Sequence, residues 1–282
     1  MWNLARPQLD DMEEQLTTAF SNEAGTGLTA DELTLLRVLY KRYEAGFGRP
    51  ADTLMGTELS DVSRQKIHDA YELVQDKRRL ARLRASLKLL AERCPYCGYG
   101  HIEELDHFLQ KAVFKPFSIF PLNLVPCCGP CNRMKPRLPS NVAAQHQVHV
   151  YLEDVSQYDM LRADVNVQPG NGGLRVHYRL ERPAHMPEEL FQRVDHHMRL
   201  FKLQERFIRQ VNIFLGGLEY GMDFAYASGS EVLKDFLGKT GDSIAARQGH
   251  NDWRVALMKG LAECPAFCAG GYKAAAGIQP VA

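Results

Sequence analysis

The 282-residue sequence has no excess of charge of either sign and no long apolar run. Its 34 Lys and Arg residues balance 34 Asp and Glu residues. This balance excludes a uniformly basic protein that coats nucleic acid and a strongly charged disordered tail. No segment approaches the roughly 18 apolar residues of a membrane-spanning helix. The N-terminus reaches Asp10 without a continuous apolar stretch, so we expect no signal peptide, no membrane partner and a cytoplasmic chain.

The sequence also lacks internal repeats, the phosphate-binding loop of an ATPase, a helix-turn-helix pattern and a homing-type DNA-recognition module. Hydrophobic residues make up 45% of the chain, which is enough for a buried core. The charge is uneven, because residues 76–137 hold twelve Lys and Arg against five Asp and Glu. Such a basic centre fits a phosphate-contacting surface, and a solvated helix face is the alternative.

The seven cysteines are an odd number, which argues against a disulfide framework and favours metal binding. The stretch "CPYC" places Cys94 and Cys97 about thirty residues before Cys128 and Cys131 of "CCGPC". Two C-x-x-C pairs supply the four thiolates of a tetrahedral structural zinc site. Cys127 is then a small buried hydrophobe. A dithiol redox site is disfavoured, because neither pair begins a helix in a βαβ pattern.

Two helical patterns fill most of the first 93 residues. One opens with Thr29 as N-cap and Glu32 three residues later, and it stops at Gly46. The other runs through residues 59–93, with leucines on one side and, on the other, the basic residues Lys77, Arg78, Arg79, Arg82, Arg84 and Lys88.

The second half of the chain begins with short β-like runs. Strands are predicted for "VHVYLEDV", "LRADVNV" and "LRVHYRLE", and the turn-rich "QPGNGG" between the last two predicts a hairpin. A third helical pattern covers residues 187–220, and its aromatic stripe is typical of core packing. Shorter helices are expected around residues 229–238 and 243–262.

Between the two cysteine pairs lie "LDHFLQK", with Asp106 and His107, and "FPLNLVPCCGPCNRMK", with Asn123 and Asn132. This order resembles the HNH endonuclease family, also called the ββα-metal or His-Me finger, over about residues 94–135. In that family an Asp-His or His-His pair ends the first strand, and a middle asparagine follows in an "NL" context. A His or Asn then opens the helix after the second knuckle.

The resemblance implies an α+β fold, in which a zinc-stapled ββα module lies within a mostly helical chain. A short β-hairpin and C-terminal helices would follow the module. We therefore divide the chain into a helical N-terminal region with a basic helix (1–93), the HNH module (94–137), short strands (138–182) and a helical C-terminal region (183–282).

The activity that the resemblance implies is metal-dependent hydrolysis of DNA phosphodiester bonds. His107 would act as general base on the attacking water, and Asp106 with Asn132 would hold a catalytic Mg²⁺ or Mn²⁺. Asn123 would brace the loop so that His107 presents the correct ring nitrogen. The structural zinc would be a scaffold only, held by Cys94, Cys97, Cys128 and Cys131.

Lys135 and Arg133 would contact the substrate phosphate, whereas Lys111 and Lys115 are interpreted as surface charges. The plainer roles of core histidine, turn cap and helix N-cap are the alternatives for His107, Asn123 and Asn132. Towards the C-terminus, Cys264 and Cys268 are interpreted as packing residues. A second metal site formed by these two cysteines and His250 is the weaker alternative.

The leading functional hypothesis is an HNH endonuclease that nicks or cuts DNA. A single site cuts one strand per engagement, so double-strand breaks would require a homodimer or repeated nicking. Target choice would come from a partner protein, such as the ATPase of a phage-defence or restriction-like system in which this chain is the effector. The alternatives are a non-catalytic zinc-ribbon module that binds nucleic acid or a partner, and an RNA-directed HNH nuclease.

Overall fold

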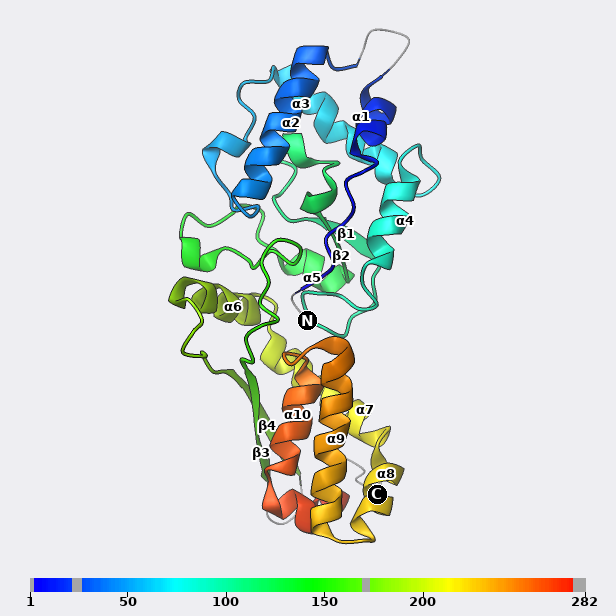
Figure 1. The fold of residues 1–282 in the computed structure, drawn as a ribbon, viewed down its shortest axis with the longest axis vertical. Helices are drawn as coiled ribbons and strands as arrows, with labels where there is room; N and C mark the ends of the chain where they lie inside the picture. The colour runs from blue at the N-terminus through cyan, green and yellow to red at the C-terminus, as the bar shows by residue number, and fades with distance from the viewer. Residues whose placement is uncertain (1–2, 22–26, 169–172, 276–282) are drawn as a thin grey trace. The chain divides into compact units, whose positions relative to one another are not determined.

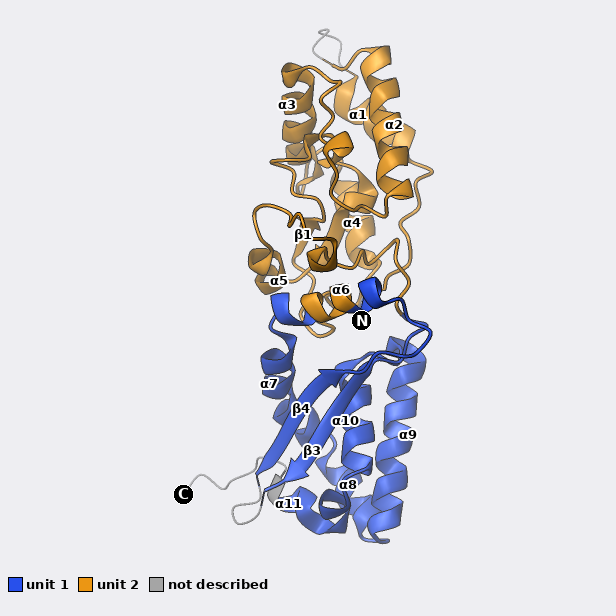
Figure 2. Cartoon of the chain, turned by 90° about the vertical axis from the view of Figure 1, so that its left-hand side faces the viewer, with its two compact units in different colours: residues 1, 156–191, 198–282 blue, residues 2–155, 192–197 orange. Residues whose placement is uncertain are grey.

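The computed structural model describes residues 3–21, 27–168 and 173–275 (Figure 1). It has an α+β fold in which helices predominate and the strands form two separate antiparallel pairs, which confirms the predicted fold class. The chain forms two compact units (Figure 2). The N-terminal unit contains Trp2–Val155 and Gln192–His197, and the C-terminal unit contains Ser156–Phe191 and Met198–Ala282.

The N-terminal unit surrounds one small sheet with helices and short helical turns. Its helices are α1 (Met12–Phe20), α2 (Ala30–Ala45), α3 (Asp61–Asp69), α4 (Ala81–Leu89) and α5 (Gly129–Met134). Its strands are β1 (Glu104–His107) and β2 (Leu124–Cys127). Short 3-10 helices are η1 (Asp52–Leu54), η2 (Ala70–Val74), η3 (Lys115–Phe117), η4 (Pro121–Asn123) and η5 (Ala143–Gln145).

Helix α2 begins and ends where the sequence predicted. The Thr29 hydroxyl accepts the Glu32 backbone N–H at 3.2 Å, and the Glu32 carboxylate accepts the Thr29 N–H at 2.9 Å. Tyr40 and Tyr43 of this helix are buried against Phe120, and the Tyr40 and Phe120 rings stack with centroids 4.0 Å apart. Because Phe120 lies between β1 and β2, α2 fixes the segment that joins the two strands.

The single helix predicted for residues 59–93 is wrong. The segment is divided into α3, η2 and α4. Lys77 adopts a φ of 65°, in the left-handed region, and the Leu80 N–H returns to the Leu73 carbonyl at 2.8 Å. Regular leucine spacing cannot distinguish one long apolar face from two short ones. The break lets α4 bring Arg84 to a pocket wall instead of a wholly solvated face.

The strand predicted for "VHVYLEDV" is also wrong. The His149 carbonyl accepts the N–H groups of Leu152 and Glu153 at 3.2 and 3.0 Å, so the chain turns here. The Glu153 carboxylate accepts the His149 N–H at 2.8 Å and closes the turn. Four consecutive residues, 148–151, are buried, whereas a half-exposed strand would bury every second one.

The C-terminal unit contains a hairpin and several helices. The strands are β3 (Leu161–Val167) and β4 (Leu174–Leu180), and the helices are α7 (Leu203–Gly216), α8 (Glu219–Tyr226), α9 (Ser230–Gln248), α10 (Trp253–Ala262), the π-helical turn η6 (Phe267–Gly271) and α11 (Tyr272–Ala275). Helix α6 (Glu188–Leu200) contributes residues to both units. The predicted hairpin is confirmed, with Leu161 opposite Leu180, although residues 169–172 of its turn lie outside the described residues.

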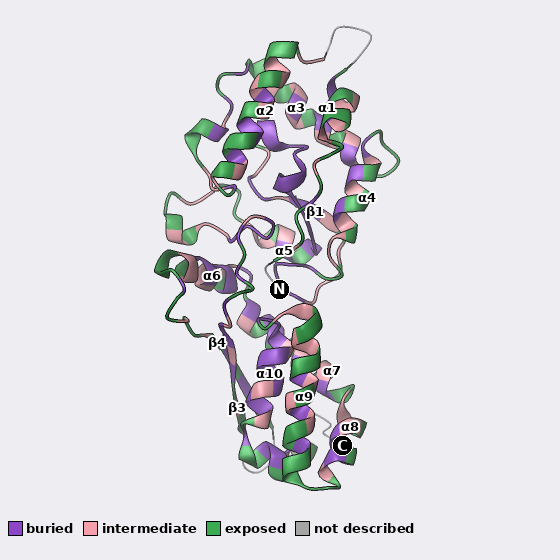
Figure 3. Cartoon of the chain, in the orientation of Figure 1, coloured by how far each residue is buried: buried purple, intermediate pink, exposed green. Residues whose placement is uncertain are grey.

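The predicted helix over residues 187–220 is interrupted. It is divided into α6 and α7 at Lys202, whose φ of 49° is again left-handed. Helix α10 packs directly against β3. The contact is so close that a Cβ on Gly260 would lie 2.2 Å from the Ala163 carbonyl oxygen. Figure 3 shows that most of α10 is buried. Within the described ranges, no helix is long and apolar enough to cross a membrane.

Candidate metal centre and adjoining pocket

A ββα arrangement of β1, β2 and α5 positions the predicted site. The two strands pair antiparallel, from Glu104 opposite Cys127 to His107 opposite Leu124. The chain leaves β2 directly into Cys128, which is the N-cap of α5. The end of β1 and the start of α5 therefore lie on one small framework, with the second cysteine pair built into it.

The four predicted zinc ligands, Cys94, Cys97, Cys128 and Cys131, are buried, and their sulfur atoms lie within 4.8 Å of one another. The sulfurs of Cys97 and Cys128 are 3.9 Å apart. Four sulfurs about 2.3 Å from a tetrahedral ion would be separated by roughly 3.8 Å, so the group could hold a metal such as zinc. Cys127 is buried outside this group, as predicted.

The backbone around the first cysteine pair is shaped for thiolates. The Gly98 N–H donates to the Cys94 carbonyl at 2.7 Å, and the Gly100 N–H points at the Cys97 sulfur at 3.4 Å. The Gly100 N–H thus favours negative charge on the Cys97 sulfur, and the thiolate is the form that binds metal.

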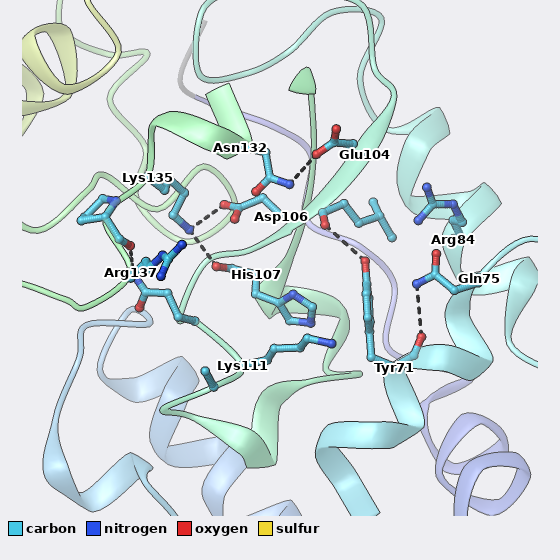
Figure 4. A pocket seen from close by; sticks show the side chains of 14 residues that line it. Tyr71, Gln75, Arg84, Glu104, Asp106, His107, Lys111, Asn132, Lys135 and Arg137 are labelled. Carbon is cyan, nitrogen blue, oxygen red and sulfur yellow. Dashed lines mark hydrogen bonds and ion pairs between the residues drawn. The ribbon is translucent and has the colours of Figure 1, made fainter. Parts of the chain in front are cut away.

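A pocket of about 520 Å³ opens beside β1 (Figure 4). Of the residues predicted for catalysis or phosphate contact, Asp106, His107, Asn132 and Lys135 line it. The other ionisable or polar lining residues were not assigned to the site from the sequence: Tyr71, Gln75, Arg84, Glu104, Gln110, Lys111 and Arg137. Tyr71, Gln75 and Arg84 precede residue 94, where the resemblance to the HNH family begins, so the family pattern did not indicate them.

Asp106 is buried, with 4% of its surface exposed, and its carboxylate is neutralised. Its Oδ2 accepts the Tyr96 hydroxyl at 2.7 Å and the Lys135 ammonium at 2.6 Å. Lys135 also donates to the carbonyls of His107 and Phe108, at 2.7 and 3.0 Å. All three ammonium protons therefore have acceptors, and the phosphate contact predicted for Lys135 would require this ion pair to open.

Asn132 is oriented by Glu104, a residue that the sequence interpretation missed. The Asn132 amide nitrogen donates to the Glu104 carboxylate at 2.5 Å. Asn132 and Asp106 both line the pocket (Figure 4). Because Glu104 and Asp106 are two residues apart on β1, their side chains share one face of the strand. A carboxylate and an amide oxygen are the types of ligand that a hard divalent cation takes, but the Asp106 carboxylate is occupied by the Lys135 ammonium in this structure.

His107 is the last residue of β1 and lies on the side of the pocket formed by Tyr71 and Lys111 (Figure 4). Its Nε2 is 2.9 Å from the Ser118 carbonyl. Because a carbonyl only accepts, Nε2 carries the proton of the neutral ring, and Nδ1 keeps the lone pair. Burial lowers the pKa of His107 to about 3, so the ring is neutral at physiological pH. The Tyr71 ring packs edge-on against it, with centroids 4.3 Å apart.

Asn123 does not line the pocket but is fully buried behind it. Its side-chain oxygen accepts the Leu109 N–H at 2.7 Å, and its amide donates to the carbonyls of Leu109 and Phe117 at 3.0 and 3.1 Å. It therefore ties together the two ends of the loop that carries Ser118, whose carbonyl orients His107. The bracing role of Asn123 stays a prediction, and these bonds favour it.

A second layer of buried polar groups holds Asn123. The Tyr43 hydroxyl is 3.0 Å from the Asn123 side-chain oxygen and 2.9 Å from His149 Nε2. His149 Nδ1 accepts the Tyr151 N–H at 3.2 Å, so Nε2 is the protonated nitrogen and donates to Tyr43. Burial lowers the pKa of His149 to about 3. This layer reaches α6, because Arg193 forms a buried ion pair with Glu153.

The remaining predicted residues lie apart from the pocket. Arg133 is 71% exposed along its side chain, 3.8 Å from Glu104, and does not line the pocket. Cys264 and Cys268 are buried, and the Cys268 thiol points to the Leu261 carbonyl at 3.5 Å. Within the described residues, they belong to no group of three or more potential metal ligands.

Comparison with known proteins gives a partial likeness. No family model matches the chain, and no solved structure matches it. The chain is 30% identical over 159 residues to Protein ea31 of Escherichia phage lambda. The aligned part covers 55% of this chain and 53% of that protein, so the chain spans about half the length of this curated relative.

Proposed function

We propose that the chain is an HNH endonuclease that hydrolyses DNA phosphodiester bonds with Mg²⁺ or Mn²⁺. The observation that supports this most is the convergence of Asp106, His107 and Asn132 on one pocket at the end of a ββα arrangement. The cysteine group would hold zinc as a structural staple, outside the reaction.

Each residue has a defined task in this proposal. Asp106 and the side-chain oxygen of Asn132 would hold the catalytic cation, which when bound would neutralise charge on the scissile phosphate and leaving oxygen. His107 would take a proton from the attacking water at Nδ1, since Nε2–H is committed to the Ser118 carbonyl. Asn123 would keep that carbonyl in place through its bonds to Leu109 and Phe117.

The Lys135–Asp106 ion pair favours a second candidate, a zinc-stapled module that binds nucleic acid or a partner without cutting. A carboxylate already neutralised at 2.6 Å is a weaker cation ligand until the lysine moves away. In the nuclease, cation binding would displace the ammonium, which could then approach the substrate phosphate. In the binding module, the pair would persist and no metal-dependent cleavage would occur.

Supercoiled-plasmid cleavage distinguishes the two candidates. The purified chain is assayed with Mg²⁺, Mn²⁺ or EDTA beside His107→Ala, Asn132→Ala and a matched control, His177→Ala, whose imidazole is 63% exposed on β4. Metal-dependent nicking by the wild type and His177→Ala, lost in the two site variants with zinc content unchanged, would support the nuclease. Duplex binding without nicking in either metal would support the binding module.

An effector role in a phage-defence or restriction-like system, with target choice supplied by a partner such as an ATPase, is a further part of this proposal. It rests on the sequence showing no module for target recognition. Selective cleavage of a defined DNA sequence by the chain alone would contradict it.

A further inference from the structure

Lys111 occupies the pocket beside His107 rather than a solvated surface, where the sequence interpretation put it. Its ammonium lies 4.7 Å from the centre of the Tyr71 ring. Such a cation–π contact holds the side chain in place without neutralising its charge. No ion pair involves Lys111 among the described residues, in contrast to Lys135, whose protons all have acceptors. Lys111 is therefore the pocket lysine available to an anion.

Two arginines line the same pocket from separate segments. Arg84 comes from α4, and Arg137 comes from the exposed segment after α5. Figure 4 shows them on opposite sides of the pocket, with His107 and Lys111 between them. Arg84 is 3.4 Å from Asp76, but that carboxylate is 82% exposed and the pair is weak. Arg84 also donates to the Glu103 carbonyl at 3.3 Å, but its Nε has no hydrogen-bond partner among the described residues. The remaining donors of Arg84 and the exposed Arg137 guanidinium are thus able to bind an oxyanion that enters from solvent.

The basic side of the pocket continues onto the surface through the turn before α4 and the first turn of that helix. Four residues there, which we call the basic track, are exposed and form no ion pair within the described part of the chain: Lys77, Arg78, Arg79 and Arg82. The left-handed turn at Lys77 and the first turn of α4 bring these charges together next to Arg84. A cluster of unpaired cations beside a pocket is the electrostatic footprint of a phosphate backbone.

We propose that Arg84, Lys111 and Arg137 bind the phosphates on either side of the scissile bond, and that the basic track extends this contact along a DNA duplex. The helical region before the first cysteine pair would then supply much of the grip on DNA, whereas the ββα arrangement supplies the chemistry. The inference rests on the proposed nuclease function of the pocket.

The test is a salt titration of binding to a fluorescein-labelled 24-base-pair duplex. Binding is monitored by fluorescence anisotropy in buffer without Mg²⁺, Mn²⁺ or chelator, so that no strand is cut and the cysteine group keeps its metal. The full chain is compared with Lys111→Gln, Arg137→Gln and Arg78→Gln/Arg82→Gln. Matched controls are Arg175→Gln and Arg209→Gln, which remove exposed cations from the C-terminal unit. Removing one cation that binds a phosphate should reduce the slope of log affinity against log salt by about 0.9.

The expected result is a slope reduced by about 0.9 for each single variant and about twice that for the double variant, with both controls unchanged. Equal slopes in all proteins, or the same reduction in the controls, would overturn the inference, as would absence of duplex binding by the wild type at low salt. Because binding is measured without cleavage, a chain that shows the expected slopes but never nicks plasmid would contradict only the nuclease proposal.

Discussion

Lys135 and Tyr96 donate to the same oxygen of Asp106, at 2.6 and 2.7 Å, in a place that water hardly reaches. The side chains of Lys135 and Asp106 are only 5% and 6% exposed. A buried ion pair of this kind is costly to break from one side, because the partner stays behind as an unpaired charge. The pair ties the chain after α5 to β1.

Lys135→Met should therefore destabilise the protein by about 3–5 kcal/mol, as expected when one partner of a buried pair is removed. Lys135→Met combined with Asp106→Asn should recover a large part of that loss, since no charge is then left unpaired. Urea unfolding of the zinc-loaded proteins measures both. A single variant as stable as the wild type would show that the ion pair contributes little.

In the proposed nuclease, Glu104→Ala should reduce nicking by roughly 10- to 100-fold, the size of effect usual for residues that orient a metal ligand. The physical reason is that the Asn132 amide loses its acceptor and no longer keeps its oxygen in the same orientation. Glu104→Gln retains an acceptor oxygen and should lose less. Glu103→Ala, at the exposed neighbouring position, serves as control in the same plasmid assay across a range of Mn²⁺ concentrations. Equal losses in the two alanine variants would count against this orienting role.

The free energy of unfolding should fall as the pH is lowered from about 6.5 towards 3. Burial lowers the pKa of His149 from 6.5 to about 3 and that of His197 to about 4. Between these values the unfolded chain binds protons that the folded chain does not, so stability rises with pH across this window. Each such histidine contributes up to about 1.4 kcal/mol per pH unit.

His149→Gln should make that pH dependence shallower by nearly one proton at pH 4.5–5.5, because glutamine does not titrate. His177→Gln, at an exposed position on β4, is the matched control. Urea unfolding at several pH values gives the slope directly. A His149→Gln slope equal to that of the wild type would mean that His149 is not the buried neutral group described above.

Gly100→Ala should weaken metal binding by the cysteine group. A Cβ at this position would lie 2.8 Å from both the Cβ and the sulfur of Cys128, and 3.3 Å from the sulfur of Cys97. Gly238→Ala is the matched control, because a Cβ there meets nothing within 4 Å and alanine favours the interior of α9. Competition with a chelating dye measures zinc retention. Identical retention by both variants would show that the cluster tolerates the added carbon.

The sequence predicted the cysteine group, the capped helix α2 and the β3–β4 hairpin, because each depends on local spacing or local turn chemistry. It missed the breaks at Lys77 and Lys202, where non-glycine residues adopt left-handed conformations that leave apolar periodicity intact. It also missed Glu104 and Lys111. Glu104 lies two residues before Asp106 on β1, so the alternation of a strand could have indicated it. The place of Lys111 in the pocket depends on how the loop after β1 folds against distant segments, which no local pattern records.

The middle of α6, residues 192–197, belongs to the N-terminal unit, whereas both ends of the helix belong to the C-terminal unit. A truncation or recombination that separates α6 from residues 2–155 would therefore remove part of the N-terminal unit. Arg193, in the middle of that helix, is the buried counter-ion of Glu153, and His197 Nε2 lies 2.9 Å from the Tyr96 carbonyl, to which it donates. A gene fragment ending near residue 155 would encode every predicted catalytic side chain and still lack these two anchors. The framework of the proposed site is therefore not self-contained, and a graft of it into another protein would have to include a segment that is distant in sequence.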